Sequence, residues 1–192
     1  MPFSGGMTPV ILSECLDALS ESAGEVAATV LGGVAFEALS ASSSYGSGHG
    51  AYLGLVADDE PIQVGVLVDP AGCQILTKAL LGMEPEDGDL EPSDVSDAMC
   101  EIANIVAGGL KRRVSGRMRI ALGLPIFVAG HPLPNQQQEV SARGLKLGAV
   151  AVTLLVLTQK AHSTPVSRSG VTTHTAGEGP AKEKSAWARR FS

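Results

Sequence analysis

Residues 93–114 constrain the fold more than any other part of this chain, because they suit only a helix with one apolar side. At about 100° per residue, one stripe of such a helix is apolar, with spacings of four, three, four and four residues. Its members are Val95, Met99, Ile102, Val106 and Leu110. A helix with a single apolar stripe buries that stripe against another layer of the protein. We therefore expect this helix to cover a second layer.

The opposite stripe of the same helix is polar or glycine throughout: Asp97, Glu101, Asn104, Gly108 and Lys111. Glu101 and Asn104 are three residues apart, so their side chains are surface neighbours. Asparagine is a poor mid-helix residue, because its side chain competes for the backbone. The adjacent glycines cost about 1 kcal/mol each relative to alanine. Two interpretations follow: a solvated face with glycines for close packing, or a pair that stands above a low surface and enters another protein's active site.

The rest of the chain predicts one further long helix, a shorter helix and several strands. Helices are expected at 8–31 and 69–81, each ended by glycine. Strands are expected at 52–57, 63–68, 120–129 and 149–157. The first two form a hairpin with Pro61 outside both strands, Pro125 puts the third at a sheet edge or a bend, and the Val/Leu-rich fourth suits a central position. The predicted class is α+β, a single two-layer domain with a β-sheet packed against two long helices.

A short internal sequence repeat relates the two long helices. Residues 24–33 and 100–109 share Glu, Ala, Val, Gly and Gly at a constant offset of 76 residues. The pattern indicates a duplicated half-domain whose two helices lie side by side, although two Ala- and Gly-rich helices can also match by chance. Asn104 is matched by Ala28 in the first copy. If the asparagine is essential, the chain has one site.

Charge and cysteine usage limit the function classes. Residues 1–157 carry 8 basic and 18 acidic residues, which opposes nucleic-acid binding, whereas residues 158–192 carry 6 basic and 2 acidic residues. The three cysteines are far apart and the four histidines lack metal-ligand spacing, so we expect reduced thiols, a cytoplasmic protein and no metal site. No signal peptide or membrane-spanning run is evident. We expect one domain at 1–159 and a disordered basic tail at 160–192.

The pattern Asp97-x-x-x-Glu101-x-x-Asn104, followed by Pro125, resembles the signature of the CheC/CheX/FliY family of chemotaxis phosphatases. The stretches DAMCEIANIVAGGLKRRV and ALGLPIFVAG look most like the CheX branch. The resemblance covers about residues 8–159. The gap from Asn104 to Pro125 is slightly shorter than the usual pattern, and the basic tail is an addition.

The resemblance implies a phosphatase that hydrolyses the aspartyl phosphate of a CheY-like response-regulator receiver domain in chemotaxis or two-component signalling. It makes Glu101 and Asn104 the catalytic pair, and we expect Asp97, Gly108 and Lys111 to contact the partner. It also implies a homodimer without cofactors of its own, the Mg²⁺ ion being bound in the active site of the partner receiver.

A site of only two catalytic side chains suits the hydrolysis of an aspartyl phosphate. An aspartyl phosphate is a reactive acyl phosphate, and its hydrolysis mainly needs a water molecule in line with the leaving oxygen. A carboxamide such as Asn104 both donates and accepts hydrogen bonds without adding charge, so we expect it to orient that water. Glu101 would pair with the receiver's lysine. Three alternatives remain: a receiver-binding module that sequesters without turnover, a flagellar-switch-associated protein, and a dimeric scaffold.

Overall fold

The computed structural model describes residues 9–39, 48–130 and 136–160 of the 192-residue chain. Three helices form within these ranges: α1 (Pro9–Thr29), α2 (Pro70–Leu81) and α3 (Pro92–Val114). Six strands accompany them: β1 (Phe36–Ala38), β2 (His49–Ala57), β3 (Glu60–Val68), β4 (Ile120–Ala129), β5 (Gln138–Leu147) and β6 (Val150–Gln159). The predicted tail at 160–192, apart from residue 160, and the first residue of the helix predicted at 8–31 lie outside the described residues.

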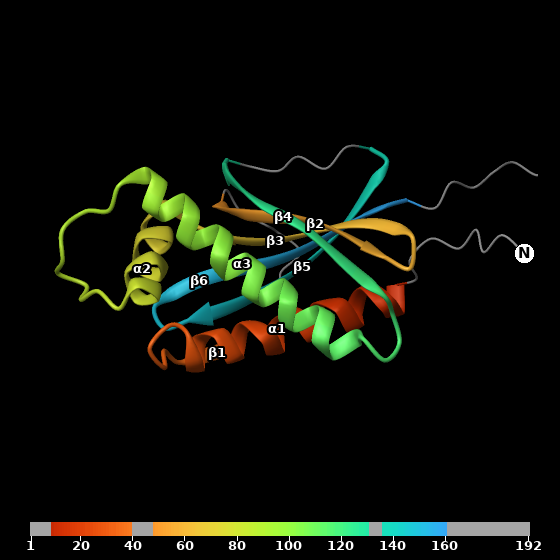
Figure 1. Cartoon of the computed structure of the whole chain (residues 1–192), viewed down its shortest axis with the longest axis horizontal. Coiled ribbons are helices and arrows are strands. Elements are labelled where there is room, and N and C mark those ends of the chain that lie inside the picture. The colour runs from red at the N-terminus through yellow and green to blue at the C-terminus, as the bar shows by residue number, and fades with distance from the viewer. Residues whose placement is uncertain (1–8, 40–47, 131–135, 161–192) are drawn as a thin grey trace, which may run out of the picture. The chain divides into compact units, whose positions relative to one another are not determined.

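The strands form one antiparallel sheet in the order β1-β5-β6-β3-β2-β4. The long helices α1 and α3 pack against one face of this sheet, and α2 packs beside α3 (Figure 1). Most buried side chains lie between the helices and that face. A smaller cluster on the opposite face contains Tyr52, Leu67, Leu155 and Leu157. The α+β class and the two-layer arrangement are therefore confirmed.

Strand β6 shows why its sequence is almost continuously apolar. It lies between β5 and β3, so it has hydrogen-bonded neighbours on both sides. Leu154 and Val156 face the helices, whereas Leu155 and Leu157 belong to the cluster on the opposite face. A strand that is buried on both faces needs apolar residues at successive positions. The predicted central position is confirmed.

The hairpin of β2 and β3 closes through Asp58 and Asp59, both with positive φ, at 46° and 75°. Two such residues suit the tight two-residue turn that joins twisted antiparallel strands. The prediction that Pro61 lies outside both strands is wrong, because Pro61 lies in β3 opposite Val56. Pairing of β3 with β6 begins only at Ile62, so the absent N–H group of Pro61 removes no bond from that ladder.

Strands β1 and β5 were not predicted from the sequence. In β5, polar and charged residues such as Gln138, Glu139, Arg143 and Lys146 interrupt the apolar pattern. The strand forms because it pairs with β6 along its whole length, across a turn in which Gly148 has a φ of 60°. β1 has only three residues and pairs with the end of β5. Tertiary pairing, and not local propensity, determines both strands.

Helices α1 and α3 approach closely at one glycine. A Cβ atom added to Gly109 would lie 1.8 Å from Oγ of Ser22, a buried residue of α1. Outside this contact, Arg113 pairs with Glu21 at 3.1 Å and also with Glu25. The two long helices thus lie side by side as expected, but their origin as a duplicated half-domain stays a prediction. The matched glycines differ in role, because Gly32 and Gly33 follow the end of α1 with positive φ, whereas Gly108 and Gly109 lie within α3.

Two core thiols give the fold an expected sensitivity to alkaline pH. Burial, and secondarily the charges of Glu14 and Asp69, raises the pKa of Cys15 and of Cys73 to about 11. Above the ordinary thiol pKa of about 9, the unfolded chain therefore releases these protons first. The free energy of unfolding should fall as the pH rises from about 9 to about 11. Urea titrations at several pH values test this, and a Cys15→Ala/Cys73→Ala variant should lose part of the slope. An identical slope in that variant would contradict the prediction.

Candidate functional site

Helix α3 is built to present one stable face to solvent. Pro92 occupies its first turn, Asp94 places a negative charge near the N-terminus, and Lys111, Arg112 and Arg113 place positive charges in the last turn. Charges in this order complement the helix dipole. The predicted apolar stripe is buried, and Met99, Ile102 and Leu110 are fully enclosed. The helix bounds and its buried face are as the sequence predicted.

The predicted polar stripe lies on the opposite, outward face of α3. Asp97, Glu101, Asn104 and Lys111 are exposed, and Gly108 is partly exposed. The structure thus brings all five predicted site residues to one surface. Glu101 and Asn104 lie one turn apart, with about 4.5 Å between their positions along the axis.

The side chains of Glu101 and Asn104 have no partner within the described part of the chain. No hydrogen bond or ion pair joins either of them to another described residue. The matching glutamate of α1, Glu25, is instead engaged by Arg113 and, at 3.7 Å, by Arg112. The position that matches Asn104 is Ala28, which has no polar side chain. Only the α3 copy therefore offers a free carboxylate beside a free carboxamide.

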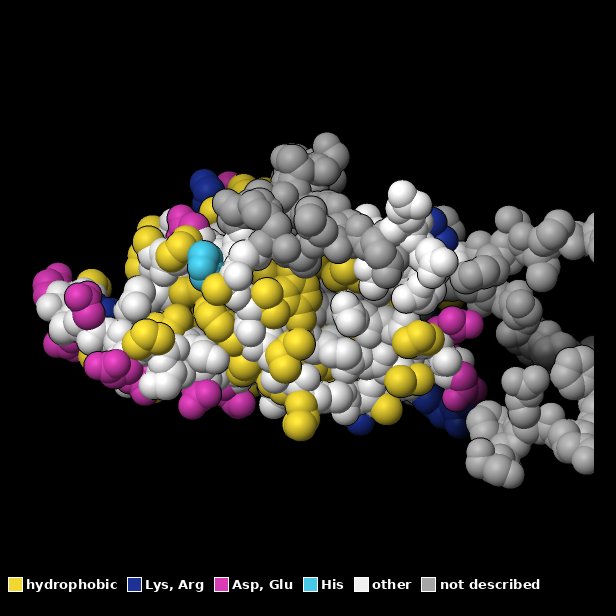
Figure 2. All heavy atoms as spheres, turned by 90° about the horizontal axis from the view of Figure 1, so that it is seen from above, with side chains coloured by type: hydrophobic (Ala, Val, Ile, Leu, Met, Phe, Trp, Pro, Cys, Tyr) yellow, Lys and Arg dark blue, Asp and Glu magenta, His cyan; other side chains and the backbone are white. Residues whose placement is uncertain are grey.

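The electrostatic surroundings of the pair are acidic on the N-terminal side. Residues 79–110 contain eight acidic and no basic residues. Acidic side chains gather at the end of the molecule where α2 connects to α3 (Figure 2). The charge of Lys78 lies in that connection and not on α3, because its Nζ donates hydrogen bonds to the carbonyl oxygens of Pro85 and Asp87. A partner that approaches Glu101 thus meets a negative surface.

Cys100 adjoins Glu101 but is not an activated nucleophile. Burial, and then the negative charge of Asp97, raises the pKa of its thiol. A raised pKa keeps the sulfur protonated at neutral pH, and the thiolate is the reactive form. The chemistry available on this face is therefore hydrogen bonding and charge, supplied by Asn104 and Glu101.

Pro125, the outlying member of the predicted signature, lies in the edge strand β4. It pairs with Leu53, next to an irregularity in the β2–β4 ladder between Leu53 and Leu55. β4 packs against α3, and the neighbouring side chains of Leu124 and Ile126 are 87% and 63% exposed. The expected edge position of this strand is confirmed. Apolar side chains also gather on the middle of the face shown in Figure 2.

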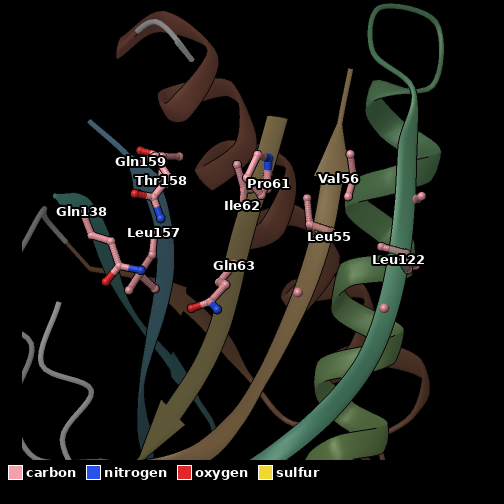
Figure 3. Close-up of a pocket in the computed structure, with 13 residues that line it drawn as sticks. Leu55, Val56, Pro61, Ile62, Gln63, Leu122, Gln138, Leu157, Thr158 and Gln159 are labelled. Atoms are coloured by element: carbon pink, nitrogen blue, oxygen red, sulfur yellow. The ribbon is translucent and has the colours of Figure 1, made fainter. Parts of the chain in front are cut away.

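A separate groove of about 400 Å³ lies on the sheet, away from the residues of the stripe. Its lining comes from β2, β3, β4, β5 and β6 (Figure 3). The polar side chains there are those of Gln63, Gln138, Thr158 and Gln159. None of the described residues that line it is charged. Sequence reasoning did not find this groove, because the register of five strands creates it.

The described residues contain neither a metal-binding cluster nor a membrane-spanning helix. No cluster of His, Cys, Asp or Glu side chains there is arranged to hold a metal ion. None of the helices among these residues is long and apolar enough to cross a membrane.

Comparisons with known proteins agree with the geometry. The family model described as chemotaxis phosphatase CheX matches residues 54–143, a range that includes Glu101, Asn104 and Pro125. A search of curated proteins gave no significant match. The fold is similar to that of chemotaxis protein CheX from Desulfovibrio desulfuricans, with 19% identity, a TM-score of 0.62 and coverage of 76% of this chain and 99% of that one.

Two other solved structures extend the comparison. In the CheX–CheY–BeF3–Mg complex from Borrelia burgdorferi, the matched chain is 17% identical with a TM-score of 0.63, over 76% of this chain and 97% of that one. The FliM middle domain from Helicobacter pylori shares the fold at 10% identity and a TM-score of 0.56, over 80% of this chain and 94% of that one. The matched sequence region and the shared fold are consistent with the CheC/CheX/FliY family, and in particular with CheX.

Proposed function

We propose that this protein hydrolyses the aspartyl phosphate of a CheY-like receiver domain, with Glu101 and Asn104 of α3 as its catalytic pair. The observation that carries the proposal is the exposed, unpartnered state of these two side chains on a rigid helix. The free carboxylate and the free carboxamide lie on an exposed helix face, and neither side chain lines the groove of the sheet. They suit a target that brings its own pocket, as a receiver does.

Asn104 orients the attacking water. Its carboxamide oxygen accepts a hydrogen bond from the water, which places the water oxygen in line with the phosphorus. The bond between water oxygen and phosphorus forms as the bond between phosphorus and the aspartyl oxygen breaks. The products are the free aspartate carboxylate and inorganic phosphate, which takes up both the hydroxyl group and the remaining proton of the water. The receiver's Mg²⁺ neutralises charge on the phosphoryl oxygens.

Glu101 holds the partner in register. Its carboxylate lies one turn before Asn104 and forms a charge-assisted pair with the receiver's active-site lysine. Asp97, Gly108 and Lys111 extend the contact along α3. We also propose that the protein acts in the cytoplasm, which suits its three free cysteines, and that it forms a homodimer, which sedimentation measurements would establish.

The proposal is tested by the decay of phosphorylated receivers. A panel of receiver domains is phosphorylated with a small phosphodonor, and decay is followed with this protein at one hundredth of the receiver concentration. We expect at least one receiver to lose its phosphate faster, with many turnovers per molecule of this protein. Tight binding without faster decay would instead favour a sequestering module. Binding to motor components and to no receiver would favour a flagellar-switch protein.

A further inference from the structure

No described residue of this chain requires position 108 to be glycine. A Cβ atom added there would meet nothing closer than Nη1 of Arg112, at 3.9 Å. The residue lies inside a helix, and its φ is not in the left-handed region. A glycine in such a place destabilises the helix by about 1 kcal/mol relative to alanine. Neither packing nor backbone conformation offsets that cost.

The next residue shows the opposite case. Gly109 faces α1, and an added Cβ atom would collide with Oγ and Cβ of Ser22 at 1.8 and 2.6 Å. Close helix packing thus explains Gly109 but not Gly108, which lies on the outward stripe with Asn104. The two glycines therefore differ in what requires them to be small. For Gly109 it is the packing against α1, whereas for Gly108 it can only be an object outside the described chain.

We propose that the main chain of the receiver crosses α3 at Gly108, so that this glycine is a specificity-determining contact. This inference rests on the proposed function and deepens it. Gly108 lies one turn after Asn104, about 6 Å along the axis. A methyl group at this position would hold the partner's main chain away from α3. It would thereby withdraw the scissile phosphoryl group from the water that Asn104 orients.

The unpaired charges of the polar stripe of α3 define the direction in which the receiver crosses this helix. Asp97 and Glu101 lie before Asn104, and neither forms an ion pair with a described residue. Lys111 follows Gly108 and is likewise unpaired, whereas Arg112 and Arg113 are engaged by acidic residues of α1. The receiver therefore presents a basic group to Glu101 and an acidic group to Lys111. Complementary charges of this kind fix the register of an interface.

The experiment uses the full chain and calorimetric titration with a receiver activated by beryllofluoride and Mg²⁺. Gly108→Ala should weaken binding about tenfold and lower kcat/KM for dephosphorylation by a similar factor, which is about 1.4 kcal/mol. Its thermal stability should be equal to or greater than that of the wild type, so misfolding cannot explain the loss. Gly116→Ala is the matched control, because an added Cβ atom also meets nothing within 4 Å there, beyond the end of α3. This control should bind normally.

The outcomes separate the inference from the proposed function. If the Gly108→Ala protein had the affinity and the kcat/KM of the wild type, the proposed crossing at Gly108 would be overturned. Turnover by the wild-type protein would still support the proposed phosphatase activity. A wild type that binds receivers without turnover would overturn the phosphatase, and the titration would still decide Gly108. A wild type that binds no receiver would overturn both. Lys111→Glu should weaken binding, and unchanged affinity would overturn the assigned direction.

Discussion

Asn104→Ala is expected to slow receiver dephosphorylation by about 100-fold or more, which corresponds to about 2.7 kcal/mol of transition-state stabilisation. The side chain is exposed and forms no described contact, so its removal leaves the fold intact. Alanine is also the better helix former, so thermal stability should rise slightly. Affinity for the beryllofluoride-activated receiver should change little. Stopped-flow decay, thermal denaturation and calorimetric titration measure the three quantities on the same preparation.

Three matched variants test the roles. Asn104→Gln keeps the carboxamide but moves it by one methylene, so partial activity is expected, because water placement depends on distance. Asn104→Asp adds a negative charge near the phosphoryl group and should be as impaired as alanine. Glu101→Gln should weaken binding more than it lowers kcat, because it removes a charge-assisted pair with the partner. Wild-type rates in Asn104→Ala would rule out the water-orienting role.

The asymmetry between the two long helices explains why one site is expected and not two. In α1, the matched glutamate is held by two arginines of α3, and the matched asparagine is replaced by Ala28. The ion pairs of Glu25 therefore attach α1 to α3 instead of facing a partner. Glu101 has no equivalent arginine among the described residues. The copy of the sequence repeat in α1 thus contributes to the helix interface, and the copy in α3 keeps its polar pair free.

Prediction from sequence succeeded where the determinants are local. The bounds of α2 follow from Asp69, whose side chain accepts a hydrogen bond from the backbone N–H of Gly72, and from Gly82 in the left-handed conformation. The two stripes of α3 follow from helical periodicity alone. Both features depend on residues within a few positions of one another.

Prediction failed where distant segments determine the structure. Strand β5 needs β6, and the groove needs the register of five strands. The Leu147-Gly148-Ala149-Val150 stretch carried a usable signal, because Gly148 closes a tight hairpin between β5 and β6. No comparable signal in the sequence shows which apolar strand residues face away from the helices. Strand pairing decides to which face of the sheet each of these side chains points.

Gly109→Val is expected to lower the free energy of unfolding by about 3 kcal/mol, at the upper end of ordinary overpacking. The added side chain would enter the space of Ser22, which is 1% exposed and belongs to the neighbouring helix. Accommodation requires α1 and α3 to separate, which would also strain the ion pairs that Arg113 forms with Glu21 and Glu25. Urea denaturation followed by far-ultraviolet circular dichroism measures the change.

The neighbouring glycine and the facing serine provide the controls for this prediction. Gly108→Val faces solvent and should change stability by less than about 1 kcal/mol, because only helix propensity is altered. Ser22→Gly should partly restore stability in the Gly109→Val background, because it removes the atoms that the valine meets. The difference between the stability change of the double variant and the sum of the two single changes would measure the contact between residues 22 and 109. If Gly109→Val were as stable as the wild type, α1 and α3 would not pack at this point. Equal losses at the two glycines would instead attribute the effect to valine in a helix, and would remove the distinction between Gly108 and Gly109.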